Sequence, residues 1–289
     1  MPSASDWVAG ARPRTLPAAI APVVAGTGVA AYADGAVWWK AALALVVSLA
    51  LQVGVNYAND YSDGVRGTDD DRVGPMRLVG SGRAAPGSVK RAAFLAFGVA
   101  GLAGLALAAT TDWWLVAVGL ACIVAAWFYT GGEHPYGYLA LGEVMVFVFF
   151  GLVAVVGTTY VQTGDLEEAA VYAAVGVGAL ACAILVVNNL RDVPTDTVAG
   201  KRTLAVRLGE ERTRLLYLLL VLAAAVAVVA VAAATTWTAL LGLGFLVPAL
   251  RAVRTVLTGA SGAALVPVLQ QTGTAELAWA VLVALPLVV

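Results

Sequence analysis

The chain has 289 residues, of which 61% are hydrophobic and only 12% are charged, and its formal net charge is −1. An ordinary soluble domain has roughly 45–50% apolar and about 25% charged residues, so this composition excludes a soluble globular protein and indicates an integral membrane protein. The near-neutral charge also argues against a nucleic-acid partner, because no basic excess exists to displace counterions from a phosphate backbone.

Apolar segments follow one another along the chain, each long enough for a transmembrane helix. Crossing the hydrocarbon core takes about 20 mainly apolar residues, because a helix pairs its own backbone amides where lipid cannot. The first segment follows Arg12 and Arg14 and shows no distinct small-residue cleavage site, so we expect a permanent helix rather than a signal peptide. Residues 1–289 are therefore predicted to form a single all-α membrane domain with about nine transmembrane helices. The expected spans are 15–33, 38–58, 92–110, 113–130, 139–161, 169–189, 214–234, 237–256 and 266–288.

Basic residues are distributed unevenly between the two sides of the predicted bundle. If the connections alternate sides, the amino terminus and the segments near 59–91, 131–138, 190–214 and 251–265 share one face. That face carries 16 of the 17 Lys and Arg residues, and only Lys40 lies opposite. Because Lys and Arg in short loops favour the cytoplasm, we expect a multi-pass protein of the plasma membrane with a cytoplasmic amino terminus.

Acidic residues are concentrated in two of these cytoplasmic segments. Clustered carboxylates repel one another unless a cation joins them, and carboxylate oxygens with water are the ligands that Mg²⁺ prefers. A solvated loop is the simpler alternative. The first segment contains Asp60, Asp63, Asp69, Asp70 and Asp71, and the second contains Asp192, Asp196, Glu210 and Glu211.

The two acidic segments repeat one pattern. Asn59 precedes Asp63 by four residues in QVGVNYANDYSD, and Asn188 precedes Asp192 by four residues in AILVVNNLRDVPTD. Helical residues four apart share a face, so these side chains are expected to point together from two helix ends.

A basic, glycine-containing stretch follows each acidic segment. Arg77 lies in GPMRLVGSGR, and Lys201 lies in GKRTLAVRLG. Basic side chains beside exposed backbone amides suit phosphate oxygens. Each of the two segments thus pairs acidic residues that can bind metal with basic residues that can bind phosphate. This repeated pairing predicts a diphosphate site.

Pro194 lies between the two acids of the second segment, Asp192 and Asp196. Proline lacks a backbone N–H and disfavours helix at the preceding residue, Val193. We therefore expect the helix to kink or end there, with the two carboxylates meeting through a turn.

Together these motifs resemble the UbiA superfamily of intramembrane prenyltransferases. The resemblance lies in NDYSD at 59–63, in Asp69, in the D-x-x-x-D of Asp192 and Asp196, and in GKRTL at 200–204. It covers nearly the whole chain. The longer stretches GVRGTDDDRVGPMRLVGSG, YTGGEHPYGYLALGE, VFFGLVAVVGTTYVQTG and NNLRDVPTDTVAGKRTLAVRLG resemble the branch that prenylates 1,4-dihydroxy-2-naphthoate in menaquinone biosynthesis.

This resemblance implies nine helices around a central cavity, with two Mg²⁺ ions at its cytoplasmic end. It also implies transfer of a polyprenyl group from polyprenyl diphosphate to 1,4-dihydroxy-2-naphthoate. Carbon dioxide and pyrophosphate are lost, and the product is demethylmenaquinone. The tail of the diphosphate substrate would lie among membrane lipids.

The resemblance also assigns metal ligands. Asn59, Asp63 and Asp69 are expected for the first set. The usual motif is N-x-x-x-D-x-x-x-D, and its last position falls on Gly67 here. The third ligand therefore stays open among Asp69, Asp70 and Asp71. Asp192 and Asp196 form the second set, and they join Asp63 as expected catalytic carboxylates.

Substrate-binding residues are expected around these ligands. Arg77 and Lys201 are expected to contact phosphate oxygens, with Arg191 or Arg202 as further candidates. Asn188 and Asp60 are expected to bind substrate.

An allylic carbocation left by the diphosphate would be stabilised by aromatic faces. Tyr129 is the preferred catalytic candidate, because it ends a helix beside a TGG turn. Glu143 is a further substrate-binding candidate, because an ionisable group at the start of an apolar run is a functional candidate by default, with a snorkelling or structural role as the alternative. The other aromatic candidates are Trp127, Phe128, Phe147, Phe149, Phe150 and Tyr160.

Three other functions fit parts of the sequence. A transporter can also contain internal repeats, although its site lies near the bilayer midplane and these acids lie at helix ends. A phosphatidyltransferase also uses Mg²⁺-binding aspartates, but its D-G-x-x-A-R spacing is absent. Within the UbiA superfamily, the alternative acceptor is another aromatic such as 4-hydroxybenzoate.

Overall fold

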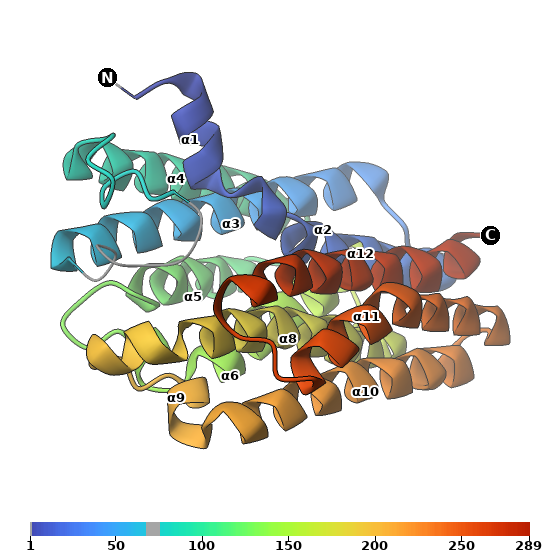
Figure 1. Ribbon diagram of the computed structural model, residues 1–289. Helices are drawn as coiled ribbons and strands as arrows, with labels where there is room; N and C mark the ends of the chain where they lie inside the picture. The colour runs from blue at the N-terminus through green and yellow to red at the C-terminus, as the bar shows by residue number, and fades with distance from the viewer. Residues whose placement is uncertain (1, 68–75) are drawn as a thin grey trace.

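The computed structural model describes residues 2–67 and 76–289, and every element in these ranges is helical (Figure 1). The α-helices are α1 (Ala4–Ala11), α2 (Pro17–Tyr32), α3 (Trp38–Arg66), α4 (Pro86–Thr110), α5 (Leu115–Phe128), α6 (Gly142–Val146), α7 (Gly157–Thr163), α8 (Glu168–Val198), α9 (Leu204–Leu208), α10 (Glu210–Ala234), α11 (Leu246–Leu257) and α12 (Val266–Val288). Short 3₁₀ segments are η1 (Pro13–Thr15), η2 (Tyr136–Tyr138), η4 (Trp237–Phe245) and η5 (Gly262–Leu265), and η3 (Phe147–Val156) is a π-helix.

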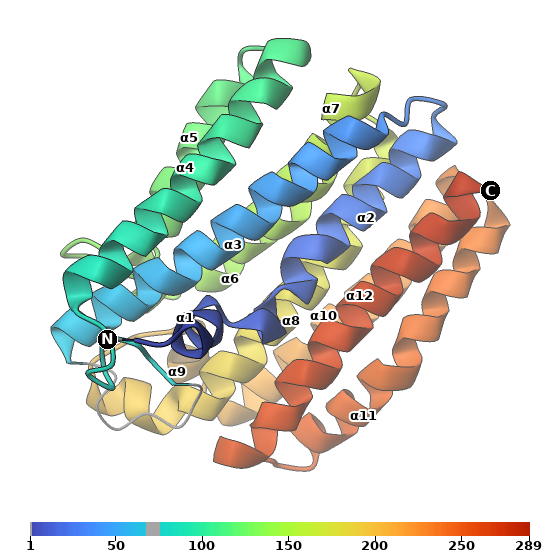
Figure 2. The same cartoon turned by 90° about the horizontal axis from the view of Figure 1, so that it is seen from above.

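The long helices run side by side in one bundle (Figure 2). Helix α3 packs between α4 and α2, α2 packs on α12, and α8 contacts both α10 and η3. Figures 1 and 2 place α1 and α9 toward one end of the bundle and the carboxyl terminus toward the other. The acidic ends of α3 and α8 lie at the end that carries α9.

Seven helices in the described part of the chain are long and apolar enough to cross a membrane. The segments Ala4–Thr15 and Pro17–Tyr32 form one further candidate span bent by 50°, while α5 is shorter, at 14 residues. Each predicted span therefore contains a helix, although length and composition support seven or eight spans rather than nine. The chain is a multi-pass membrane protein.

Small residues determine how closely α8 packs in the middle of the bundle. A Cβ on Gly176 would lie 2.2 Å from the Trp279 ring of α12, and a Cβ on Gly151 would lie 2.7 Å from the Ala174 carbonyl oxygen. Small side chains let membrane helices approach closely, where dispersion contacts replace the hydrophobic effect. This packing buries most of α8 and fixes the position of its acidic end.

Two helix ends differ from the sequence prediction. Helix α3 continues to Arg66 instead of ending near residue 58, so Asn59 and Asp63 are helical. Of the two outcomes expected at Pro194, a kink or an end, the end was wrong, because α8 continues to Val198 with Pro194 inside it. The hydroxyl of Thr197 donates to the Val193 carbonyl at 2.7 Å, which supports the last turn. Asp192 and Asp196 therefore lie four residues apart on one helix.

Candidate active site

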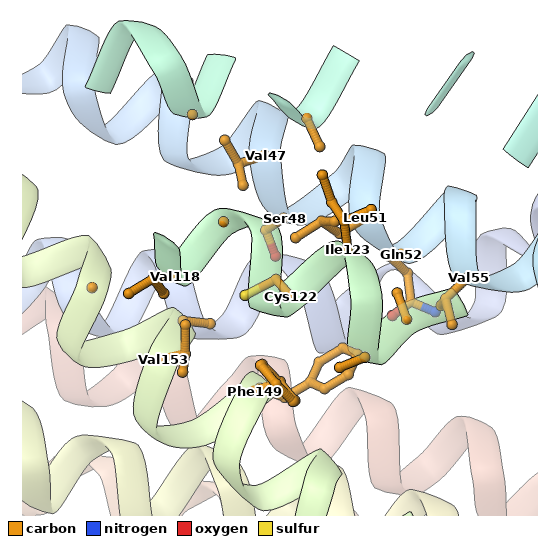
Figure 3. Close-up of a pocket in the computed structure, with 18 of the residues that line it drawn as sticks. Val47, Ser48, Leu51, Gln52, Val55, Val118, Cys122, Ile123, Phe149 and Val153 are labelled. Atoms are coloured by element: carbon orange, nitrogen blue, oxygen red, sulfur yellow. The ribbon is translucent and has the colours of Figure 1, made fainter. Parts of the chain in front are cut away.

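A cavity of about 450 Å³ lies between α3, α4, α5 and the α6–η3–α7 segment (Figure 3). Aliphatic side chains from all these helices form most of its wall, together with Phe149 and Phe150. Polar side chains follow α3 down the cavity toward its acidic end. They are Ser48, Gln52, Asn56 and Asn59.

Asp63 lies one turn beyond Asn59 and is 3% exposed. Its carboxylate accepts a hydrogen bond from the Tyr138 hydroxyl. Arg77 Nη2 lies 3.6 Å from Oδ2, and Lys201 Nζ lies 3.9 Å from Oδ1. A buried carboxylate needs such partners, because desolvation otherwise disfavours its charge. The structure therefore brings together three residues that the sequence assigned to one site.

Tyr138 is a functional candidate that the sequence analysis missed. Its ring lies 4.6 Å from Lys201 Nζ and 5.7 Å from the Arg66 guanidinium carbon. Its backbone carbonyl accepts from the amide of Arg202 at 3.0 Å. The residue thus links the end of α3 to the segment after α8. The available signal was its place in PYGY, between the two acidic motifs.

The second acidic set is organised by Arg191, which is 5% exposed. Its guanidinium donates two hydrogen bonds of 2.7 Å to the two oxygens of Asp192. Its Nη2 also donates to Asn188 Oδ1 at 2.9 Å. Asn188 and Asp192 therefore do face the same side of α8. A carboxylate has about four lone-pair positions, and this fork engages two of them.

Lys201 connects the two acidic sets. The chain turns at Gly200, whose φ of +73° is in the left-handed region that favours glycine. This turn lets the Lys201 amide donate to the Asp196 carbonyl at 2.8 Å while its Nζ reaches Asp63. The ends of α3 and α8 are thereby held beside one another.

Asp60 takes a different position from the one expected of a substrate-binding residue. Its side chain is fully buried, and its two oxygens accept the backbone N–H groups of Leu78 at 2.7 Å and Val79 at 2.9 Å. These contacts hold the segment that carries Arg77. We therefore assign Asp60 to positioning that segment.

Tyr129 and Glu143 lie near the same end of the bundle. Tyr129 lines the cavity and meets the Tyr136 ring edge-on, with centroids 5.5 Å apart. Burial raises the pKa of Tyr136, so its hydroxyl stays neutral and donates to the Ala125 carbonyl. Glu143 is buried outside the cavity wall, and its Oε1 accepts from Asn189 at 2.9 Å.

The other aromatic candidates divide by position. Phe149 and Phe150 line the cavity with Tyr129. Trp127 instead packs against Tyr61 and Phe94, and Phe147 lies against Gly178. Phe128 is 47% exposed, and Tyr160 bonds Asp112 at the opposite end of the bundle.

The donors at this site suit a hard divalent cation. Asn59, Asp63, Asp192 and Asp196 offer oxygen atoms only, in two separate pairs. Within the ranges 2–67 and 76–289, no three acidic, His or Cys side chains form a metal cage. Mg²⁺ typically binds through one or two carboxylates plus water and substrate phosphates, so paired donors fit it. The expected ligand Asp69, with Asp70 and Asp71, lies outside the described residues.

Comparisons with known proteins identify the fold and the family of the chain. The chain is 57% identical over 284 residues to the 1,4-dihydroxy-2-naphthoate octaprenyltransferase of Mycobacterium tuberculosis, covering 98% of this chain and 97% of that protein. Its fold matches the apo structure of a UbiA homolog from Aeropyrum pernix with a TM-score of 0.71 and 13% identity, covering 92% of this chain and 94% of that one. A UbiA homolog from Archaeoglobus fulgidus bound to DMAPP and Mg²⁺ matches with a TM-score of 0.66 and 14% identity, covering 98% of both chains. Residues 19–262 match the UbiA prenyltransferase family, and the chain therefore belongs to that family.

Proposed function

We propose that this chain transfers a polyprenyl group from polyprenyl diphosphate to 1,4-dihydroxy-2-naphthoate. Carbon dioxide and pyrophosphate are released, and the quinol form of demethylmenaquinone is formed. The observation that carries this proposal is 57% identity, over nearly the whole of both chains, to a protein named for that activity. The cavity and the paired acids at its polar end support the same reaction.

The diphosphate binds, in this proposal, where the ends of α3 and α8 meet. Asn59, Asp63, Asp192 and Asp196 would hold Mg²⁺, and Asp69 outside the described residues is the candidate for a further ligand. Bound Mg²⁺ would neutralise the leaving pyrophosphate and act as a Lewis acid. Arg77 and Lys201 lie within 4 Å of Asp63, so both are close enough to turn from that carboxylate to phosphate oxygens.

Arg191 and Asn188 keep Asp192 in place through the hydrogen bonds between their side chains. We assign them to orienting this carboxylate. An Arg–carboxylate fork fixes orientation more strictly than a single contact does, since two parallel bonds must form together.

The prenyl tail occupies the apolar part of the cavity, and the aromatic acceptor reaches the first prenyl carbon near Tyr129. Aromatic faces in a dry site stabilise an allylic cation and exclude the water that would capture it. Tyr129, Phe149 and Phe150 line the cavity and can supply these faces. The electron-rich naphthoate ring then forms the new carbon–carbon bond, and its carboxylate leaves as carbon dioxide.

We further propose that the bundle crosses the plasma membrane nine times, with the acidic helix ends on the cytoplasmic side. The bent α1–α2 pair and the short α5 would then count as spans beside the seven longer helices. The distribution of 16 of 17 basic residues onto one predicted face supports this orientation.

The test uses purified protein in detergent with Mg²⁺ and labelled polyprenyl diphosphate. 1,4-Dihydroxy-2-naphthoate and 4-hydroxybenzoate are offered separately, and Asp192→Asn serves as the inactive control. The proposal predicts a prenylated, decarboxylated product from the naphthoate only. If only 4-hydroxybenzoate gave a product, the prenyltransferase activity would stand and the proposed acceptor would be wrong. Activity with neither acceptor would contradict the proposed function.

A further inference from the structure

Gln52 lies on α3 in the wall of the cavity, between Ser48 and Val55 (Figure 3). Its side chain is 7% exposed, and its Oε1 has no hydrogen-bond partner within the described residues. A buried amide oxygen left without a donor costs free energy, so such an atom in a binding cavity marks a place where a ligand can donate.

The orientation of this amide follows from a chain of hydrogen bonds that begins at backbone carbonyls. Thr15 Oγ1 donates to the Arg12 carbonyl at 2.9 Å, so its lone pairs must face N–H groups. Asn56 Nδ2 donates to the Ala11 carbonyl at 2.9 Å and to Thr15 Oγ1 at 3.0 Å. Gln52 Nε2 donates to the same Thr15 oxygen at 3.0 Å.

These contacts leave one arrangement for the Gln52 amide. The Asn56 nitrogen is committed to carbonyl and hydroxyl oxygens, so its Oδ1 faces Gln52 and accepts from Nε2 at 3.4 Å. If the oxygen and nitrogen of the Gln52 amide were exchanged, the Gln52 oxygen would face Thr15 Oγ1 and Asn56 Oδ1, which are both acceptors here. The nitrogen is therefore held by Thr15 of η1 and Asn56 of α3, and Oε1 is the atom left for the cavity.

No neighbouring cavity group supplies the missing donor. The Ser48 hydroxyl, one turn away, donates to the Ala19 carbonyl at 2.7 Å. The Tyr136 hydroxyl donates to the Ala125 carbonyl. Val55, Leu51 and Ile123 are apolar members of the same wall.

We infer that Gln52 Oε1 accepts a hydrogen bond from a ring hydroxyl of the aromatic acceptor and thereby sets the acceptor's orientation. The inference rests on the proposed function. An amide oxygen repels a carboxylate, so the acceptor enters with a hydroxyl toward Gln52 and its carboxylate toward the basic end of the site. Seven residues separate Gln52 from Asn59, about 10 Å along the helix, which leaves room for a bicyclic ring.

The experiment compares wild-type protein with Gln52→Met, which preserves side-chain length and removes the acceptor atom. KM is measured for 1,4-dihydroxy-2-naphthoate and for polyprenyl diphosphate. Loss of one neutral hydrogen bond predicts a rise of roughly three- to tenfold in the acceptor KM, with the diphosphate KM within about twofold of wild type.

Gln162→Met is the matched control. Gln162 is also a buried amide, but it lies outside the cavity wall, and both its ends are engaged, with Val37 N–H, Thr27 and Thr158. This variant is expected to lower the melting temperature and leave the acceptor KM unchanged. A similar rise in acceptor KM in both variants would assign the effect to stability and overturn the inference.

Inhibition constants separate a direct contact from a change in cavity shape. The ligands are 1-hydroxy-2-naphthoate and 4-hydroxy-2-naphthoate, each lacking one hydroxyl. One analogue lacks the hydroxyl that donates to Gln52, and it should bind wild type and Gln52→Met with equal affinity. The analogue that keeps this hydroxyl should bind Gln52→Met more weakly than wild type, as 1,4-dihydroxy-2-naphthoate does. Equal weakening of both analogues, or weakening of neither, would overturn the inference.

The two proposals fail in different ways. If wild-type protein prenylates the naphthoate and Gln52→Met behaves like wild type, only the Gln52 inference falls. If wild-type protein prenylates 4-hydroxybenzoate instead, the acceptor of the proposed function is wrong. The same comparison is then made with 4-hydroxybenzoate and benzoate. If wild-type protein prenylates neither acceptor, both proposals fall.

Discussion

Tyr138 contacts both the end of α3 and the segment after α8, and so it joins the two acidic motifs into one site. Its hydroxyl bonds Asp63 of α3, and its carbonyl bonds the Arg202 amide in the segment after α8. Its ring face lies beside Lys201, where a cation–π contact is worth about 0.5–2 kcal/mol depending on exposure. One side chain therefore positions a carboxylate and a cation together.

Replacing Tyr138 by Phe removes the hydroxyl and keeps the ring. Hydrogen bonds to charged groups contribute about 1.5–3 kcal/mol, so we expect kcat/KM to fall by at least about tenfold and the Mg²⁺ requirement to rise. Steady-state kinetics over a Mg²⁺ titration measures both. Tyr160→Phe is the matched control, because Tyr160 also donates to a carboxylate, Asp112, but at the opposite end. Equal losses in the two variants would contradict a special role for Tyr138.

At the level of the helices, the end of α3 carries two acids three residues apart, Asp60 and Asp63, which have different contacts. Asp60 faces the following segment and accepts two of its backbone amides, while Asp63 faces Tyr138, Arg77 and Lys201. The position of Arg77 therefore depends on Asp60, although Asp60 itself holds the backbone and Arg77 faces Asp63.

Asp60→Asn should weaken diphosphate binding without removing the chemistry. The amide has one acceptor oxygen, and its nitrogen would face a backbone N–H of Leu78 or Val79. We expect the KM for diphosphate to rise about fivefold or more, in keeping with a lost charge-assisted hydrogen bond. Hydrogen exchange at the Leu78 and Val79 amides should also become faster. A fall in kcat with both KM values unchanged would place Asp60 in the chemistry instead.

Helix α8 offers a second prediction at this scale, because it continues through an exposed proline. Pro194→Ala restores a backbone donor in the last turns and removes the steric cost of the ring. Activity within about twofold of wild type is expected, with an equal or higher melting temperature. A large loss of activity would mean that the site requires a distortion imposed by Pro194.

The helices could be predicted because apolar length and helical spacing are local properties of the chain. Every predicted span contains a helix, and the Asn188–Asp192 pairing follows from four-residue spacing. Three features were not predictable. Pro194 was expected to interrupt α8, since local propensity ignores the Thr197 hydroxyl bond to Val193. Asp60 and Tyr138 have roles defined by residues 18 and 75 positions away along the chain, which no spacing rule connects.

At the scale of the whole molecule, the carboxyl-terminal ends of α3 and α8 lie with α9 at one end of the bundle, while the carboxyl terminus of the chain lies at the other (Figure 2). This polarity is the basis for the proposed cytoplasmic active site. It requires that the connection between α11 and α12 lie inside and that the connection between α7 and α8 lie outside.

Single cysteines test this orientation after Cys122 and Cys182 are replaced by Ala. Ser261→Cys lies in the α11–α12 connection, and Asp165→Cys lies in the α7–α8 connection, with both positions exposed. A membrane-impermeant maleimide should label Asp165→Cys in intact cells and Ser261→Cys only in inside-out vesicles. The reverse pattern would invert the topology, and labelling of both from one side would contradict the alternation of spans.

In the proposed mechanism, the ends of α3 and α8 form one Mg²⁺-dependent diphosphate site. It is tested most directly by calorimetric binding of a non-hydrolysable prenyl thiodiphosphate to wild type, Asp63→Asn, Asp192→Asn and the double variant, with and without Mg²⁺. One shared site predicts that each chain binds one ligand and that binding depends on Mg²⁺. Either single variant should lose this binding, and the double variant should bind no more weakly than the weaker of the two single variants. Binding that persists unchanged in either single variant, or two independent stoichiometric sites, would contradict it.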